Sequence, residues 1–192
     1  MVDGVWRRPE AERSSDQQQE SLTAALHYAE RGFRIVPLWP MHNGRCECAK
    51  GASCAGKHSP LKGWQRLASS DPRELRRWWA KWPSAGVGAV LDGETFVLDI
   101  DPRNTGDESF AVLVREHGEL PATLTHRSGG GGLHYFLRAP FVVPNADGVA
   151  AGVDVLGRGH LVVLPPSNHR SGERYSVERE SEIAAAPAWV LG

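Results

Sequence analysis

The sequence lacks any long apolar run, and its longest apolar stretches have only the length of a β-strand. A helix that crosses a bilayer needs about 20 apolar residues in a row, so no membrane-spanning segment is expected. The N-terminus is polar and has no apolar stretch of the kind found in secretory signal peptides. No segment recurs at a fixed period, which excludes repeat arrays and coiled coils. We therefore expect a soluble, cytoplasmic protein with no membrane partner.

A large excess of charge of either sign is also missing. The chain has 22 Lys and Arg residues against 23 Asp and Glu residues, a formal net charge of -1. Strong non-specific binding to nucleic acids needs many basic residues that neutralise phosphates, so it is not expected. A local basic cluster remains at Arg73, Arg76, Arg77 and Lys81. It is either a solvated helix face or a contact for nucleic acid, and the sequence leaves both interpretations open.

Cysteine is scarce, and all three cysteines lie close together. Cys46, Cys48 and Cys54 precede His58 in the pattern C-x-C-x5-C-x3-H. An odd number of cysteines suits a disulfide framework poorly, and the cytoplasm disfavours one. Three thiolates and an imidazole complete the tetrahedral shell of a structural Zn²⁺ ion, so a zinc site is predicted. Free thiols are the alternative, and His42 competes with His58 for the fourth position.

With 192 residues, of which 41% are hydrophobic, the chain can bury a core as one domain, or as one domain with a small appended module. A polar, flexible tail is expected at residues 1–16. Apolar residues at helical spacing predict a helix at 17–31, with a stop at Gly32, and a buried strand follows at 33–38. Residues 39–63 show no periodicity, and so long a loop usually marks function or a metal site.

The next helix has clear start signals. Asp71 fits the N-cap and Pro72 the first helical position, with Glu74 three residues after the cap. The helix has an apolar stripe, which favours packing in the core over a platform for a ligand. The members of this stripe are Leu75, Trp78, Trp79 and Trp82.

The remainder of the chain is rich in strands. Residues 86–91 and 95–100 are predicted to pair as a hairpin around the turn at Asp92, and a helix is expected at 107–117. Further strands are expected at about 122–127, 133–139, 153–156, 160–164 and 173–177. Helices and strands followed by several successive strands favour an α+β fold with an antiparallel or mixed sheet.

Two carboxylates stand at the end of an apolar strand in the segment ETFVLDIDPRN. Residues two apart in a strand point to the same face, so Asp99 and Asp101 project together while Leu98 and Ile100 point to the core. Neighbouring carboxylates repel each other unless a cation lies between them, and oxygen ligands favour Mg²⁺ or Mn²⁺. The alternative is a strand that simply ends in an Asp-Pro-Arg-Asn turn.

A third acid strengthens the metal interpretation. Asp154 alternates with Val153 and Val155 in GVDVLGRGHLVVLPPS, so its carboxylate faces away from the valines. Three such acids on neighbouring strands would suit a two-metal phosphoryl-transfer site. The sequence alone does not show that the strands of Asp99 and Asp154 are adjacent.

A glycine-rich stretch lies between these acids in HRSGGGGLHYFLRAP. Consecutive glycines allow backbone N–H groups to approach a phosphate closely. His134 follows directly, and with Ser128 and Arg127 it is a candidate contact for a triphosphate. A plain hairpin and a structural histidine are the alternatives. No Gly-Lys-Ser/Thr follows, so this is not a Walker A motif. The residues predicted to seat the triphosphate here are Arg127, Ser128, Gly129, Gly130 and His134.

In their order and spacing these segments resemble the bifunctional primase/polymerase (prim-pol) domain of the archaeo-eukaryotic primase superfamily, known from plasmids, phages and integrated elements. The resemblance covers about residues 22–177. The matching segments are ALHYAERGFRIVPL, the Cys/His loop ending in GKHSP, KGWQ, WWAKWPSAGVGAVL, VLDIDPRN, SGGGGLHYFL and GVDVLGRGHLVVLPPS.

The resemblance implies a catalytic domain over residues 17–192, with an RRM-like sheet, an N-terminal α/β module and an inserted zinc stem at about 40–63. It assigns Asp99, Asp101 and Asp154 to two catalytic Mg²⁺ or Mn²⁺ ions. His134 with Ser128 matches the family's nucleotide-phosphate motif. Lys62 and Arg158 are looser candidates for phosphate contact.

The activity that the resemblance implies is nucleotidyl transfer. The family makes and extends primers on single-stranded DNA from dNTPs, often with a ribonucleotide to start, and commonly works with a helicase. A metal-dependent nuclease and a non-catalytic single-strand-binding module are the alternatives. The chain departs from the family pattern at GKHSP, where GKHP is usual, and at His160, where a small residue is usual.

Overall fold

The computed structural model describes residues 10–191 of the chain, with side chains from Gln19 onward. Helix α1, Glu10–Glu30, begins before the start predicted at Gln17. Residues 10–16 are polar but include good helix formers, so helix propensity extends a helix that apolar periodicity could not detect there. The rest of the tail predicted at residues 1–16 lies outside the described residues. The helix stops as predicted at Gly32, whose positive φ of 90° suits glycine.

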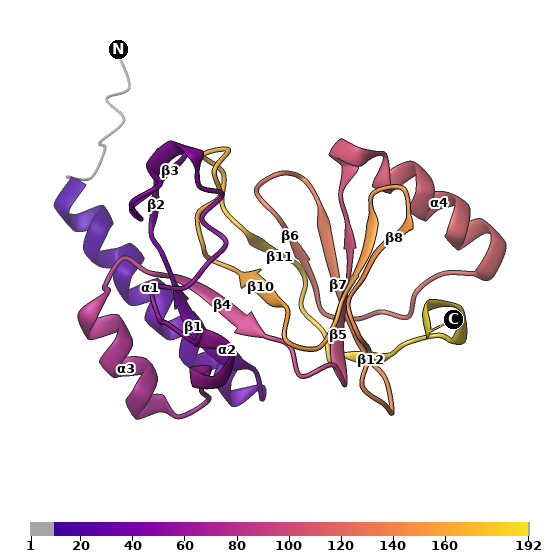
Figure 1. Ribbon diagram of the computed structural model, residues 1–192, viewed down its shortest axis with the longest axis horizontal. Coiled ribbons are helices and arrows are strands. Elements are labelled where there is room, and N and C mark those ends of the chain that lie inside the picture. The colour runs from indigo at the N-terminus through magenta and orange to yellow at the C-terminus, as the bar shows by residue number, and fades with distance from the viewer. Residues whose placement is uncertain (1–9, 192) are drawn as a thin grey trace, which may run out of the picture.

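A small antiparallel sheet of three strands forms one half of the molecule (Figure 1). Its order is β1 (Arg34–Leu38), β4 (Gly86–Val90) and β10 (Leu161–Leu164). Helices α1 and α3 (Pro72–Lys81) pack beside each other against it, and the short α2 (Trp64–Leu67) lies near β1.

Helix α3 begins as its sequence predicts. The Asp71 side chain accepts a hydrogen bond from the backbone N of Arg73, and Pro72 occupies the first turn. Leu75, Trp78 and Trp79 are buried in the core. The apolar stripe is therefore core packing, which confirms the interpretation favoured from the sequence.

A larger antiparallel sheet forms the other half (Figure 1). Helix α4 (Gly106–His117) covers one face of it, and the short α5 (Ala188–Leu191) follows near the C-terminus. The order of its strands is β11 (Ser176–Arg179), β6 (Thr125–Arg127), β7 (Leu133–Arg138), β5 (Thr95–Ile100), β9 (Val153–Leu156) and β8 (Ala146–Ala150), and β12 (Ala184–Ala185) runs parallel to the end of β7. The predicted α+β class with antiparallel sheets is confirmed.

The hairpin predicted from residues 86–91 and 95–100 is wrong. Both segments are strands, but β4 lies between β1 and β10 in the small sheet, and β5 lies between β7 and β9 in the large one. A turn signal between two strands is local. Which strands pair depends instead on which segments can bury the two faces of each strand. The turn between β4 and β5 therefore carries the chain from one sheet to the other.

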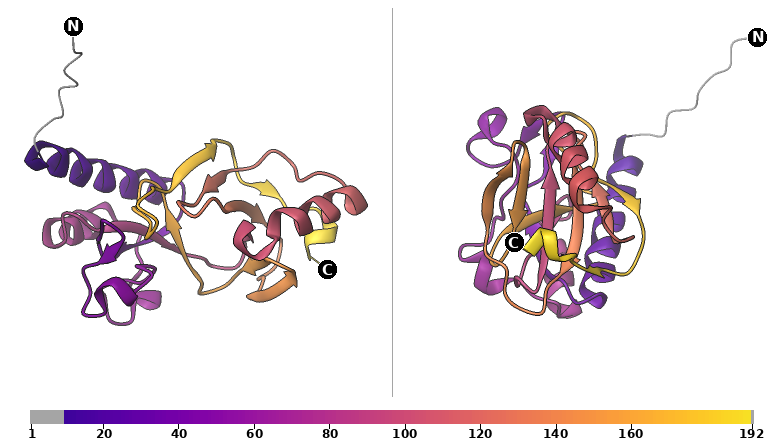
Figure 2. Two further views of the ribbon diagram at one scale, coloured as in Figure 1. Left: turned by 90° about the horizontal axis from the view of Figure 1, so that it is seen from above. Right: turned by 90° about the vertical axis from the view of Figure 1, so that its right-hand side faces the viewer.

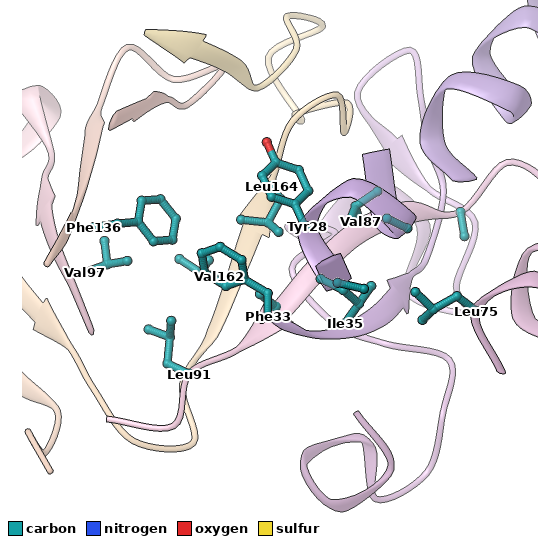
Figure 3. Packing of buried hydrophobic residues seen from close by; sticks show 14 of the residues in the cluster. Tyr28, Phe33, Ile35, Leu75, Val87, Leu91, Val97, Phe136, Val162 and Leu164 are labelled. Atoms are coloured by element: carbon teal, nitrogen blue, oxygen red, sulfur yellow. The ribbon is translucent and has the colours of Figure 1, made fainter. Parts of the chain in front are cut away.

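One hydrophobic core joins the two sheets. Val97 of β5 and Phe136 of β7 face Val162 of β10 and Phe33, which follows α1 (Figure 3). The opposite face of the large sheet packs on α4 in a second core that includes Leu98. The two halves lie side by side along the long axis, with α1 and α4 near opposite ends (Figure 2).

The long loop predicted at residues 39–63 holds only short elements. They are β2 (Met41–His42), β3 (Arg45–Cys46) and the 3-10 helix η1 (Gly51–Ser53). Strands β8 and β12 were not predicted, because β8 is mostly exposed and β12 is very short. Within residues 10–191, no helix combines the length and the apolar character that a membrane crossing requires.

Candidate functional site

Four polar side chains form a row across the large sheet. Asp99 of β5 lies opposite Asp154 of β9 on one side and opposite His134 of β7 on the other. His126 of β6 lies opposite His134 in turn. Directly opposite residues point to the same face, so the row shares the face that Val97 turns toward the small sheet. The tertiary structure thus brings together two acids that are far apart in the sequence.

Asp99 is the most strongly perturbed acid of this row. Burial raises the pKa of Asp99 to about 6, the negative charges of Asp101 and Asp154 raise it as well, and the positive charge of Lys57 opposes them. The His134 Nε2 atom lies 3.4 Å from the Asp99 Oδ1 atom. Clustered acids of this kind are stabilised by a cation, which is the chemistry of a divalent-metal site.

Asp101 directly follows β5 and is the N-cap of the 3-10 helix η2 (Pro102–Asn104). Its carboxylate accepts hydrogen bonds from the Arg103 guanidinium, at 2.9 and 2.8 Å, and from the Asn104 amide at 3.1 Å. The hydrogen bonds from Arg103 lower the pKa of Asp101. Asp101 therefore forms the turn expected from Asp-Pro-Arg-Asn. It is also an ionised acid, and its negative charge raises the pKa of Asp99.

Asp154 is half-buried, and its Oδ1 atom accepts a hydrogen bond of 2.6 Å from the backbone N of Gly148 in β8. The three acids share a face and repel one another. Hydrogen bonds from Arg103 fix the Asp101 carboxylate, and the hydrogen bond from Gly148 of β8 fixes that of Asp154. The chemistry of this donor set, three carboxylates on one face, fits Mg²⁺ or Mn²⁺.

The glycine-rich stretch forms a tight hairpin between β6 and β7. The backbone N of Ser128 donates to the Gly132 carbonyl at 2.8 Å, and the Ser128 Oγ atom accepts a hydrogen bond of 3.0 Å from the Gly132 N. A Cβ atom on Gly129 would lie 2.5 Å from the Cβ atom of His169, so glycine is required there. Ser128 alternates with Arg127 along the strand and so shares the face of His126 and His134.

Arg127 lies on the other face of the large sheet, and Arg158 and Lys62 lie in exposed turns. Arg127 lies opposite Leu133 on the other side of the sheet, where its Nε atom donates to Glu178 at 2.8 Å. Arg158 is exposed beyond the end of β9, on the side away from Asp101. Lys62 is exposed in the turn that precedes α2. We leave these three residues out of the proposed phosphate contacts.

Further polar residues lie near the acidic row. His126 is fully buried, and its Nε2 atom lies 3.4 Å from the Tyr28 hydroxyl. Burial lowers the pKa of His126 to about 3 and that of His134 to about 4. Tyr175 is buried with its ring 6.0 Å from that of His134. His160, where the chain departs from the family pattern, is half-buried; burial lowers its pKa, and the charges of Asp147 and Asp99 oppose this shift.

Three buried side-chain polar atoms have no hydrogen-bond partner in the described part of the chain, and all three belong to this region. They are His126 Nδ1, His134 Nδ1 and the Tyr175 hydroxyl. Buried polar atoms are nearly always satisfied, so such a concentration marks a place for a ligand or water. His126 had a signal in the sequence, because a hairpin centred on Gly130 places it opposite His134.

The Cys/His cluster is assembled as predicted. The ligand atoms of Cys46, Cys48, Cys54 and His58 all lie within 4.8 Å of one another. The His58 Nε2 atom is 3.1 Å from the Cys54 Sγ atom and 3.8 Å from the Cys46 Sγ atom. The competing ligand, His42, pairs instead with Glu47 at 3.0 Å.

The thiols of this cluster differ in acidity. Burial raises the pKa of Cys46 to about 12. At Cys48 desolvation acts in the same direction, but hydrogen bonds, first from the Lys50 backbone, lower the pKa to about 6. Within the described residues this is the one group of three or more Cys, His, Asp or Glu ligands that is gathered so closely. The set fits a tetrahedral metal such as Zn²⁺.

The fold and the two sites define an α+β protein with an acidic, histidine-lined face and a separate Cys₃His metal-type cluster. The family model for the bifunctional DNA primase/polymerase N-terminal domain (Prim-Pol) matches residues 25–189. The chain therefore belongs to the Prim-Pol family, and the predicted resemblance is confirmed. No curated protein matches the sequence. Membership supports a primase/polymerase-type role in replication and a nucleotidyltransferase-type enzyme.

Proposed function

We propose that the chain is a DNA-dependent primase/polymerase, which synthesises and extends primers on single-stranded DNA by nucleotidyl transfer. The observation that carries the proposal is the row of Asp154, Asp99 and His134 on adjacent strands, beside a glycine-rich hairpin. The large sheet with α4 on one face serves as the RRM-like catalytic core. Family membership supports the reaction class.

Asp99, Asp101 and Asp154 are the residues that would hold two Mg²⁺ or Mn²⁺ ions. Such ions would neutralise charge on the triphosphate while the primer 3′-hydroxyl attacks the α-phosphorus and pyrophosphate leaves. The protein contributes position and charge rather than covalent chemistry. Arg103 must release at least part of the Asp101 carboxylate for this arrangement, since it now occupies both oxygens.

His134 and Ser128 bind the triphosphate of the incoming dNTP or NTP, with backbone N–H groups of Gly129 and Gly130. Burial and the positive charge of Lys57 lower the pKa of His134 to about 4, so its imidazole is neutral at pH 7. A neutral imidazole keeps one N–H to donate to a phosphate oxygen. Zn²⁺ on the Cys₃His cluster has a structural role. The template is single-stranded DNA, and a helicase is the expected partner.

The proposal is tested with the purified chain, a labelled single-stranded template, dNTPs, ATP and Mn²⁺. We expect longer metal-dependent products, and a loss of synthesis on the order of a hundredfold or more in Asp99→Asn, because that change removes charge at the reacting centre. Asp107→Asn, an exposed acid on α4, is the matched control and should retain activity.

The alternatives give different results in the same assay. A nuclease would shorten the labelled DNA in an Asp99-dependent manner. A non-catalytic binding module would retain the DNA without any product, and Asp99→Asn would change nothing. Either result would overturn the proposed function.

A further inference from the structure

Lys57 lies in the loop of residues 39–63 that carries the Cys/His cluster, here called the zinc loop, between two of the metal-type ligands. Cys54 and His58 lie on either side of it in the sequence, and their side chains are 3.1 Å apart. The backbone N of Gly56 donates to the Cys54 Sγ atom, and the His58 carbonyl accepts from the backbone N of Trp39. A metal on this cluster would therefore hold the backbone on both sides of Lys57.

Lys57 borders a small cavity beside the zinc loop. His169 and Tyr175 line the same cavity. Tyr175 is only 3% exposed, and its hydroxyl has no partner among the described residues. Its ring contacts that of His134, which in turn lies 3.4 Å from Asp99. Lys57 of the zinc loop therefore borders the same small space as His169 and Tyr175, and Tyr175 connects that space to His134 of the large sheet.

The Lys57 ammonium is available for an anion. None of the ion pairs between the described side chains involves it. Its charge acts on the acidic site nevertheless, because after burial it is the next cause that lowers the pKa of His134 and of His169. An ammonium without an ion-pair partner can make a charge-assisted hydrogen bond to a phosphate oxygen.

The zinc loop and the glycine-rich hairpin are fastened to the same turn, residues 168–173, which lies beside the loop in Figure 1. The Asn168 amide donates to the Met41 carbonyl of β2 at 2.8 Å. On the other side, the Ser171 hydroxyl donates to the Gly129 carbonyl at 2.7 Å, and His169 packs on Gly129. The two segments are thereby held in a fixed relation across the cavity.

We propose that the zinc loop forms one wall of the nucleotide site and presents Lys57 to the phosphates of the incoming nucleotide, with Tyr175 and His169 beside it. This inference rests on the proposed function. It assigns the phosphate contact to Lys57 rather than to Lys62, and it makes the Cys₃His metal a determinant of nucleotide affinity.

Calorimetric titration with the non-reactive dATP analogue carrying an α,β-imido group, in Mn²⁺, tests the assignment. Lys57→Ala should weaken binding by about tenfold or more, because a charge-assisted phosphate contact is lost. The affinity for dAMP should change much less. Lys50→Ala, an exposed lysine of the same loop, and Lys62→Ala are the matched controls and should bind as the wild type does.

The second measurement concerns the metal of the loop. Removing Zn²⁺ should weaken binding of the analogue by the wild type and change Lys57→Ala much less. Because linkage is reciprocal, the bound analogue should also raise the affinity for Zn²⁺, measured by equilibrium competition with a chromogenic chelator, and Asn168→Ala should reduce this effect.

The outcomes separate the two proposals. A wild-type protein that binds no analogue overturns both of them. Wild-type affinity in Lys57→Ala, or equal affinity with and without Zn²⁺ in a protein whose circular dichroism is unchanged, overturns only the role of the zinc loop.

Discussion

The Asp99 carboxylate lies in a largely buried position, where ionisation is unfavourable. Its folded-state pKa of about 6 lies above the ordinary value of 3.8, chiefly because of burial. The folded chain therefore binds this proton more tightly than the unfolded chain. Stability that is present below pH 3.8 is lost as the pH rises to about 6, so without a cation the ionised acid destabilises the fold at neutral pH.

Replacing Asp99 by Asn should therefore stabilise the protein when no Mg²⁺ or Mn²⁺ is present. We expect a gain of about 2 kcal/mol in the free energy of unfolding at pH 8, after allowance for partial exposure. The gain should shrink toward zero near pH 4. Urea denaturation of both proteins at several pH values measures it.

Two buried histidines affect that comparison. Burial lowers the pKa values of His126 and His134, so both proteins lose stability as the pH falls below about 6.5. The difference between the two proteins at each pH isolates Asp99. Glu116→Gln, an exposed acid of α4, serves as control and should stay within about 0.5 kcal/mol of the wild type. A less stable Asp99→Asn variant at pH 8 would contradict the burial argument.

At the scale of elements, α3 shows how much a local signal can specify. Its N-cap bond from Arg73 N to the Asp71 carboxylate is 2.9 Å long, and the residues of its first turn are exposed or half-buried. The helix start therefore depends on the cap and on Pro72, while the buried face of Leu75 and Trp79 determines where the helix packs.

Asp71→Ala should lower the free energy of unfolding by about 1 kcal/mol, because one backbone N–H of the first turn loses its acceptor. Asp71→Asn keeps an acceptor and should cost less. Ser70→Ala, at the exposed neighbouring position, is the control. Thermal and urea denaturation measure the difference, and equal stability of Asp71→Ala and Ser70→Ala would show that the cap contributes nothing.

At the scale of the whole molecule, the two sheets depend on a shared core. Phe136 of the large sheet is fully buried and packs edge-to-face on Phe33, with ring centroids 5.6 Å apart. The same cluster includes Val87 and Val162 of the small sheet. Neither sheet can bury its inner face alone, so we expect the described fold to unfold as one unit.

Phe136→Ala should cost about 3–5 kcal/mol, because it leaves a cavity where the sheets meet. Far-UV circular dichroism and tryptophan fluorescence should report the same single transition in the wild type and in the variant. Phe141→Ala is the matched control, since Phe141 is 51% exposed. Two separate transitions would mean that the halves are independent folding units.

Much of the local structure was predictable from the sequence. Capping residues, glycine stops and strand alternation act over a few residues, so α3, α4, β7 and β9 were found close to their observed bounds. Strand alternation could also have excluded Arg127, since His126 and Ser128 must face the other side. The exposed strand β8 lacks the apolar alternation that would have indicated it.

The sequence by itself determined the residue types of the site and their local geometry: paired acids at a strand end, a glycine hairpin before His134, and a Cys₃His loop. Only the tertiary structure decided that Asp154 lies opposite Asp99, that β4 and β5 belong to different sheets, and that the charge of Lys57 acts on Asp99. The pairing of strands depends on which distant segments can bury a common core. The free energy of that burial cannot be read from a local sequence pattern.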